Sequence, residues 1–136
     1  MLRHISSEAA LSKRGAFRFA RELCVERPYA IASDRWANLP LRTTGRWGEV
    51  PTDRIADVVD GAADADGLLA VGGGSAIDLA KSVSAETGLP VVSVPTTYAG
   101  AEWTPSFGVR SPDRRIVGGG AGAKLAAIVY DVDVTL

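Results

Sequence analysis

Residues 68–95 read LLAVGGGSAIDLAKSVSAETGLPVVSVP and carry the clearest pattern of secondary structure in the chain. The first four residues of this stretch are an apolar run too short for a helix, which is typical of a buried strand. Three glycines follow, and a helical pattern then runs from Ser75 to about Glu86, where a glycine and a proline end it. Residues 91–94 predict a second buried strand. Strand, helix and strand in this order predict a βαβ unit.

Further elements are predicted on both sides of this unit. The patterns indicate helices over 7–26 and 53–63, strands over 29–32 and 127–130, a loop over 35–50, and a hairpin formed by 107–109 and 115–117. Thr52 is a plausible N-cap for the helix over 53–63. These elements predict an α/β fold with a mostly parallel sheet, flanking helices and a small β-hairpin, in a single domain over 1–136.

Composition bounds the class of protein. A chain of 136 residues with 46% hydrophobic and 23% charged residues can bury a core and does not resemble a disordered tail. A formal net charge of −1 argues against a nucleic-acid partner. No apolar run approaches the roughly 18 residues of a membrane span, and the N-terminus lacks the apolar core of a secretory signal. We therefore expect a cytoplasmic protein with no membrane partner.

Soft metal ligands are scarce in this sequence. His4 is the one histidine and Cys24 the one cysteine, so the chain cannot build a zinc-type site by itself. A single cysteine also excludes a disulfide framework and fits a reducing compartment. The sequence predicts that this chain alone holds no metal.

The glycines at 72–74 are the first candidate site. Between a strand and a helix, residues without Cβ let the backbone approach a bulky anion, and the free N–H groups of the helix start point toward it. The dinucleotide fingerprint G-x-G-x-x-G and the G-K-[ST] of the P-loop are both absent. Two interpretations stay open from the pattern: a pyrophosphate cradle, or a tight turn with close helix–strand packing.

The helix that follows the glycines also has a structural interpretation. Ser75 and Asp78 fit a capping box, in which Ser75 caps forward and Asp78 reaches back. Lys81 lies three residues beyond Asp78, and we expect the two to form an exposed ion pair.

Polar residues follow two other predicted strands. Asp34 comes after the strand over 29–32, where a carboxylate can accept a hydrogen bond from a ribose hydroxyl or simply occupy a turn. Thr96 and Thr97 follow the strand over 91–94 and can meet a nicotinamide amide or start the next helix. Ligands of open α/β sheets bind at the carboxyl ends of strands, which is where all three residues are expected.

Three segments together resemble a known family. They are GGGSAIDLAK at 72–81, PTTYAGAEWTP at 95–105 and IVYDVDVT at 128–135. They resemble the nucleotide-binding domain of the iron-containing alcohol dehydrogenase superfamily, and within it the maleylacetate reductases. Alcohol dehydrogenases of the superfamily usually carry a PTTAGTGSE-type segment, whereas the reductases carry PTTYAGSE, and this chain has PTTYAGAE. The resemblance covers 51–136 well and 15–34 loosely.

The resemblance implies a Rossmann-like domain that binds NADH or NADPH. Maleylacetate reductases reduce the carbon–carbon double bond of maleylacetate to give 3-oxoadipate in the degradation of aromatic compounds. Site residues carry over as follows: Gly72, Gly73, Gly74 and Ser75 at the pyrophosphate, Thr96, Thr97 and Thr104 at the nicotinamide side, Asp34 at the adenosine ribose, and Arg115 where the family commonly has a cofactor-contacting lysine. A carboxylate at position 34 is expected to favour NAD(H).

The chain also departs from the family. Between Asp34 and Gly72 it is shorter than usual, so one helix–strand step is expected to be reduced or lost. It stops at Leu136, where the helical domain that supplies the metal ligands of the family should begin. We therefore expect a partner, either a separate helical chain or a second copy in a homodimer. Three functions stay open: a maleylacetate-reductase-like enzyme, an iron-type alcohol dehydrogenase, or a non-catalytic remnant that binds a nucleotide.

Overall fold

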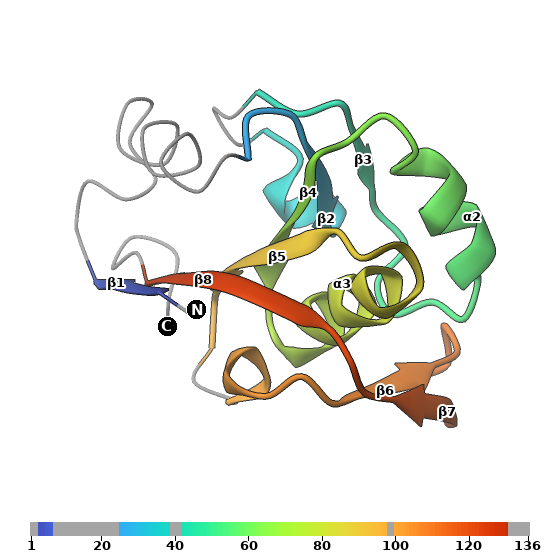
Figure 1. Ribbon diagram of the computed structural model, residues 1–136. Coiled ribbons are helices and arrows are strands. Elements are labelled where there is room, and N and C mark those ends of the chain that lie inside the picture. Colours follow the sequence, from blue (N-terminus) through green and yellow to red (C-terminus); the bar gives the residue numbers. More distant parts are fainter. Residues whose placement is uncertain (1–2, 7–24, 39–41, 98–99, 131–136) are drawn as a thin grey trace.

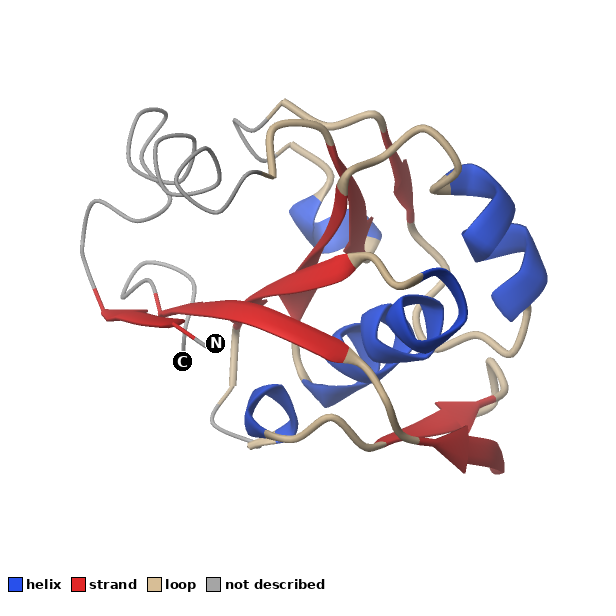
Figure 2. Ribbon diagram, in the orientation of Figure 1, coloured by secondary structure: helices blue, strands red, loops and turns tan. Residues whose placement is uncertain are grey.

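The computed structural model describes residues 3–6, 25–38, 42–97 and 100–130. Within these ranges six strands form one sheet in the order β1-β8-β5-β4-β2-β3, and every neighbouring pair is parallel. Helices α2 and α3 lie along one face of the sheet, and a separate two-stranded hairpin lies beyond α3 (Figures 1 and 2). The predicted α/β class with a mostly parallel sheet and a small hairpin is confirmed.

The elements have the following bounds. The strands are β1 Arg3–Ser6, β2 Pro28–Ala32, β3 Gly45–Trp47, β4 Gly67–Gly72, β5 Pro90–Pro95, β6 Phe107–Arg110, β7 Ile116–Gly120 and β8 Lys124–Tyr130. The helices are α2 Ile55–Gly61 and α3 Gly74–Thr87, with 3-10 turns η1 Asp34–Trp36 and η2 Ala101–Trp103.

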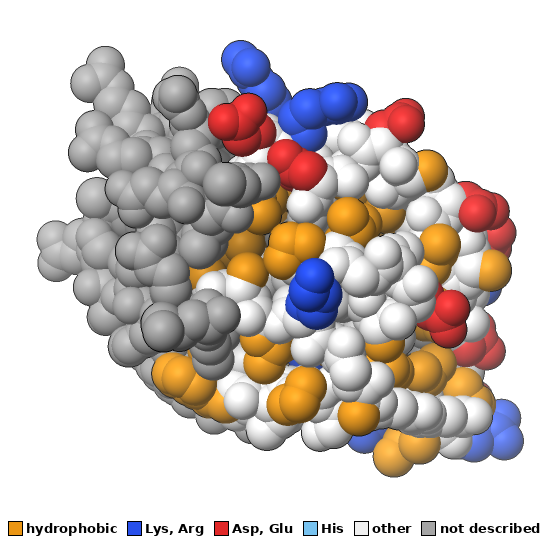
Figure 3. All heavy atoms as spheres, in the orientation of Figure 1, with side chains coloured by type: hydrophobic (Ala, Val, Ile, Leu, Met, Phe, Trp, Pro, Cys, Tyr) orange, Lys and Arg blue, Asp and Glu red, His pale blue; other side chains and the backbone are white. Residues whose placement is uncertain are grey.

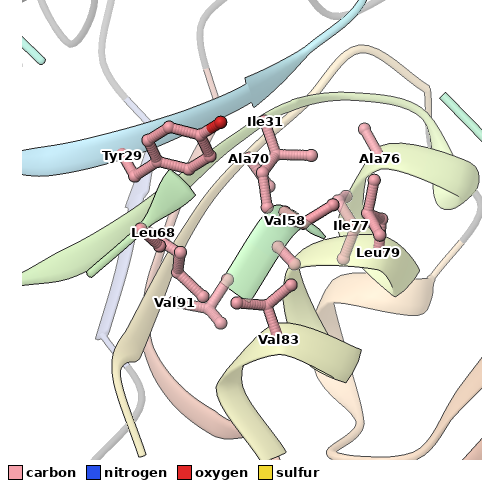
Figure 4. Close-up of a cluster of buried hydrophobic side chains, with 12 residues drawn as sticks. Tyr29, Ile31, Val58, Leu68, Ala70, Ala76, Ile77, Leu79, Val83 and Val91 are labelled. Carbon is pink, nitrogen blue, oxygen red and sulfur yellow. The ribbon is translucent and has the colours of Figure 1, made fainter. Parts of the chain in front are cut away.

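The core occupies both faces of the central strands. Successive side chains of a strand point to opposite faces, so Leu68 packs toward the helices while Leu69 packs on the other face. Figure 4 shows the helix-side cluster, in which strand residues meet Val58 of α2 and Val83 of α3. Burial on both faces explains why β4 and β5 appear in the sequence as continuous apolar runs rather than alternating ones.

The predicted loop over 35–50 is wrong in part. Its first two residues belong to η1, and residues 45–47 form β3, an edge strand that pairs in parallel with β2. A three-residue strand is too short to show a period, and its backbone pairing, which opposes Arg46 to Ala30, is a tertiary contact. The helix–strand step expected to be reduced or lost before Gly72 is reduced: a 3-10 turn joins β2 to β3, and β3 and α2 are both short.

The helix over 53–63 is shorter than predicted and Thr52 is not its N-cap. Helix α2 begins at Ile55, and its N-cap is Arg54, with no side-chain capping bond. The Thr52 hydroxyl donates to Glu49 at 2.6 Å and accepts from the Arg54 amide at 3.2 Å. Thr52 thus holds the turn before the helix, where it is buried.

The structure tests the predictions for the two termini to different extents. The predicted helix over 7–26 lies outside the described residues except for Val25 and Glu26, which are not helical. Strand β1, Arg3–Ser6, was not predicted and pairs with β8. The predicted last strand over 127–130 is confirmed as the end of β8.

Candidate functional site

Three chain segments leave the sheet at the carboxyl ends of neighbouring strands, which form one edge of the sheet. Parallel strands end side by side, and the register places Ala32 of β2 opposite Val71 of β4, and Gly72 opposite Pro95 of β5. The residues that follow these ends are η1, the glycine turn and Thr96. The sequence-predicted residues after β2, β4 and β5 therefore lie at the same carboxyl edge, where open α/β sheets bind ligands.

Gly72 is required by the fold itself. Its φ of +151° is a backbone conformation that residues with a Cβ rarely adopt, and an added Cβ would lie 2.9 Å from Cβ of Ala76. Its carbonyl oxygen accepts a hydrogen bond from the Thr96 amide at 2.9 Å, which joins the ends of β4 and β5. For this glycine the tight-turn interpretation holds.

Gly73 and Gly74 have no such requirement. Both have φ outside the left-handed range, and among the described residues a Cβ on Gly73 would meet Thr97 Oγ1 at 3.5 Å and Thr97 Cγ2 at 3.8 Å. A Cβ on Gly74 would lie 3.9 Å from Cβ of Ala101. These are ordinary van der Waals distances, so the fold would accept alanine at either position. The space left by the two missing Cβ atoms lies in front of the first turn of α3.

The predicted capping box is wrong. Helix α3 begins at Gly74 with Gly73 as N-cap, and no side chain caps it. Ser75 is therefore inside the first turn, and Asp78 uses its carboxylate elsewhere: Oδ2 accepts from the Gly108 amide at 3.4 Å. The capping box does not form because the N-cap is Gly73, two residues before Ser75, and the first-turn N–H groups are left without a side-chain cap.

The predicted exposed ion pair of Lys81 is also wrong, because Lys81 is buried. Its side chain is 1% exposed, and Nζ lies 3.3 Å from Oδ1 of Asp78. The ammonium also donates to the carbonyl oxygens of Ala101 at 2.6 Å and Thr104 at 2.9 Å. Lys81 thus ties the η2 segment to α3. Its place four residues after the buried Ile77 puts it on the inner face of the helix.

The threonines of the site differ in burial. Thr96 is buried at the end of β5, whereas Thr97 is exposed next to Gly73. Thr104 is exposed; its hydroxyl accepts from Ser106 and its carbonyl oxygen from Lys81. The structure therefore brings Thr97 to the glycine turn and holds Thr104 at the end of η2.

Asp34 lies in η1, just beyond the end of β2, and its side chain is 92% exposed. Arg46 of β3 reaches the same place. Its Nη2 lies 3.0 Å from Asp34 Oδ1, and its Nη1 donates to the carbonyl oxygen of Ala32 at 2.7 Å. A carboxylate and a guanidinium thus stand together at the end of β2.

Arg115 lies in the hairpin turn. Its guanidinium pairs with Asp113 at 3.2 Å and its side chain is 80% exposed. Hydrogen bonds, first that of the Ser111 hydroxyl, lower the pKa of the Asp113 carboxyl below its usual value. Arg115 lines a hollow with Asp53, residues 111–113, Ile116 and Val117, and none of these residues belongs to the glycine turn.

Among the described residues no group of three or more histidine, cysteine, aspartate or glutamate side chains is placed to hold a metal ion. None of the described helices is both long and apolar enough to cross a membrane.

Comparison with known proteins identifies the family. The sequence model of the iron-containing alcohol dehydrogenase family matches residues 39–131. The chain belongs to this family. Its sequence relatives include the maleylacetate reductase of Burkholderia cepacia, 43% identical over 72 residues, which are 53% of this chain and 20% of that protein. That of Pseudomonas sp. strain P51 is 36% identical over 111 residues, 77% of this chain and 32% of that protein.

Solved structures of the family share the fold. The iron-containing alcohol dehydrogenase of Corynebacterium glutamicum superposes with a TM-score of 0.83 at 25% identity, over 98% of this chain and 41% of that one. The maleylacetate reductase of Agrobacterium tumefaciens superposes with a TM-score of 0.81 at 23% identity, over 98% of this chain and 42% of that one. The Rossmann-like expectation is confirmed, and this iron-containing alcohol dehydrogenase family chain spans less than half of those structures.

Sequence reasoning missed two side chains of the site. Lys81 carried a usable signal, because Ile77 and Lys81 are four residues apart on one helix face. Arg46 carried none, since its position depends on the pairing of β3 with β2.

Proposed function

We propose that this chain is the nucleotide-binding unit of an NAD(P)H-dependent oxidoreductase, with 1–136 forming one dinucleotide-binding domain. Membership of the iron-containing alcohol dehydrogenase family supports the class of reaction. The nicotinamide coenzyme supplies a hydride when it is bound, and the residues of this chain bind and orient it.

The observation that carries the proposal is the space at Gly73 and Gly74. The fold would accept a Cβ at both positions, yet both are glycine. A bulky anion at the N-terminus of α3 explains this, because Cβ atoms there would occupy the place of the phosphate oxygens. The first-turn N–H groups, which no side chain caps, would donate to those oxygens.

The other site residues take roles according to their positions at the same edge. Gly72 shapes the turn, and the Ser75 amide would donate to the pyrophosphate. Thr96, Thr97 and Thr104 would line the nicotinamide side. Asp34 would accept from the adenosine ribose. For Arg115 we propose a coenzyme contact on the resemblance alone, since its guanidinium pairs with Asp113 in the hairpin turn.

For the substrate we propose maleylacetate. The relatives named maleylacetate reductase reach 45% identity, and the segment PTTYAGAE at 95–102 is of the reductase type. An alcohol, as in an iron-type alcohol dehydrogenase, is the alternative that the family leaves. Product analysis after incubation with maleylacetate and NADH, or with primary alcohols and NAD, distinguishes the two.

Because the chain matches only part of each relative, we propose that a separate helical chain or a second copy of this chain completes the substrate side. A completed site would exclude water from the hydride transfer. Binding of NADH without turnover by the purified chain would favour a non-catalytic nucleotide-binding role.

The proposal is tested by NADH titration of Gly73→Val, followed by the fluorescence of the reduced nicotinamide. We expect saturable enhancement with the wild-type chain and loss of binding, by tenfold or more, with Gly73→Val, because the branched side chain fills the space of the phosphate. Gly118→Val is the matched control, since Gly118 lies in β7 with only Val109 Cβ near, at 3.8 Å.

Circular dichroism and thermal unfolding show whether each variant is folded. A folded Gly73→Val chain that binds NADH as tightly as wild type would refute the phosphate cradle. So would equal losses in Gly73→Val and Gly118→Val.

A further inference from the structure

Arg46 holds a fixed position beside Asp34. Strand register opposes it to Ala30, whose neighbours Tyr29 and Ile31 pack toward the helices, so the Arg46 side chain lies on the opposite face of the sheet. It extends to the end of β2. There one terminal nitrogen donates to the Ala32 carbonyl oxygen at 2.7 Å and the other lies 3.0 Å from Asp34 Oδ1. A backbone acceptor and a carboxylate together fix the guanidinium.

The guanidinium is accessible to a ligand. The Arg46 side chain is 30% exposed and that of Asp34 is 92% exposed. Arg46 also lines a hollow whose other walls include Trp36 and Thr43. A guanidinium carries five N–H donors, and these two bonds use two of them, so donors remain for an incoming group.

The pair changes what Asp34 alone would select. A lone carboxylate at the end of this strand accepts from the 2′-hydroxyl of NAD(H) and repels the 2′-phosphate of NADP(H). A guanidinium 3.0 Å from that carboxylate cancels much of its charge and offers the planar donor fork that binds phosphate well. The site therefore contains a group suited to each coenzyme.

We infer that Arg46 is a specificity-determining residue through which this site accepts NADP(H) as well as NAD(H). In the NADH complex Arg46 stays bonded to Asp34 and the carboxylate meets the ribose hydroxyls. In the NADPH complex the guanidinium donates to the 2′-phosphate and offsets its repulsion by Asp34. This inference rests on the proposed nucleotide-binding function.

Arg35 is a second cation near the end of β2. Its guanidinium lies 5.0 Å from the ring centroid of Trp36, in the same 3-10 turn as Asp34. Arg35 could also bind the 2′-phosphate, so the experiment must distinguish its contribution from that of Arg46.

The experiment measures dissociation constants for NADH and NADPH by nicotinamide fluorescence for wild type, Arg46→Gln, Arg35→Gln and Arg54→Gln. We expect Arg46→Gln to weaken NADPH binding about tenfold or more, the loss of one charge-assisted contact, while NADH changes less than about twofold. Arg54→Gln is the matched control, because Arg54 pairs with Asp57 at the same 3.0 Å on α2. Both coenzymes should bind it as they bind wild type.

Asp34→Asn is an independent test that leaves Arg46 in place. We expect this substitution to strengthen NADPH binding several-fold, because the repelling charge is gone. The inference is overturned if Arg46→Gln changes both coenzymes equally, if Arg35→Gln rather than Arg46→Gln removes NADPH, or if Asp34→Asn leaves NADPH unchanged. Failure of the wild-type chain to bind either coenzyme would instead refute the proposed function.

Discussion

At the scale of single residues, three adjacent glycines have different reasons to be glycine. Gly72 is glycine because of its positive φ and the nearby Ala76, both of which belong to the fold. Neither the backbone conformation nor the neighbours of Gly73 and Gly74 in the described structure require glycine at these positions. A sequence shows only the letters GGG, so the two interpretations could not be separated before the space around each Cβ was known.

Alanine substitutions separate these reasons by stability. Gly72→Ala should lower the free energy of unfolding by about 1–3 kcal/mol, because the new Cβ strains the backbone and approaches Ala76. Gly73→Ala should change it by less than about 0.5 kcal/mol. Urea unfolding followed by circular dichroism measures both, and equal costs would contradict the distinction.

Lys81 is a second residue whose environment can be tested. Lys81→Met should cost about 3–5 kcal/mol, because the buried carbonyl oxygens of Ala101 and Thr104 and the Asp78 carboxylate lose their shared partner. Lys124→Met is the matched control at an exposed lysine and should cost less than about 0.5 kcal/mol. A cost for Lys81→Met as small as that of the control would show that the ammonium is not held inside.

At the scale of elements, α3 organises the candidate site. Its N-terminus faces the glycine turn, Lys81 in its middle ties down η2, and Asp78 accepts from the hairpin backbone. Long apolar patterns predicted β4, α3 and β5 well because their signal lies in their own residues. Strands β1 and β3 escaped prediction because each is short and is defined by its pairing with a distant strand.

Strand β2 gives a pH-dependent prediction through Tyr29. Burial raises the pKa of the Tyr29 hydroxyl above its usual value of 10.0, partly offset by Arg46. The folded chain therefore holds this proton more tightly than the unfolded chain, so its contribution to stability is complete below pH 10 and declines as pH rises through the folded pKa. The Tyr29→Phe chain should not show this loss of unfolding free energy at high pH.

Urea unfolding of wild type and Tyr29→Phe between pH 8 and pH 11 measures the difference. Lysine titration affects both chains alike. The unfolding free energy of wild type should therefore fall relative to that of Tyr29→Phe above pH 10. A constant gap over the whole range would contradict a raised pKa for Tyr29.

At the scale of the whole molecule, the described chain presents one edge with candidate ligand groups and a hairpin with apolar side chains. Ile116 and Val117 of β7 are 64% and 54% exposed, and Figure 3 shows hydrophobic side chains at the surface over the hairpin, beside Lys and Arg side chains. The α/β class, the glycine turn and the hairpin could be predicted from sequence. The partners of Asp34 and Lys81 could not, because they come from residues distant in the chain.

Coenzyme binding should stabilise the whole fold. A ligand that binds only the folded chain adds about 2.7 kcal/mol at a concentration one hundred times its dissociation constant. For a domain of this size that corresponds to a rise in Tm of several degrees. Thermal unfolding with NADH should show this rise for wild type and not for Gly73→Val, and an equal rise in both would place the ligand elsewhere.

The location of the pyrophosphate can be seen in a crystal structure of the chain with NADH. We expect it in the space at Gly73 and Gly74, with its oxygens within hydrogen-bond distance of the first amides of α3. A dinucleotide bound at any other surface, or a side chain filling that space in the complex, would contradict it.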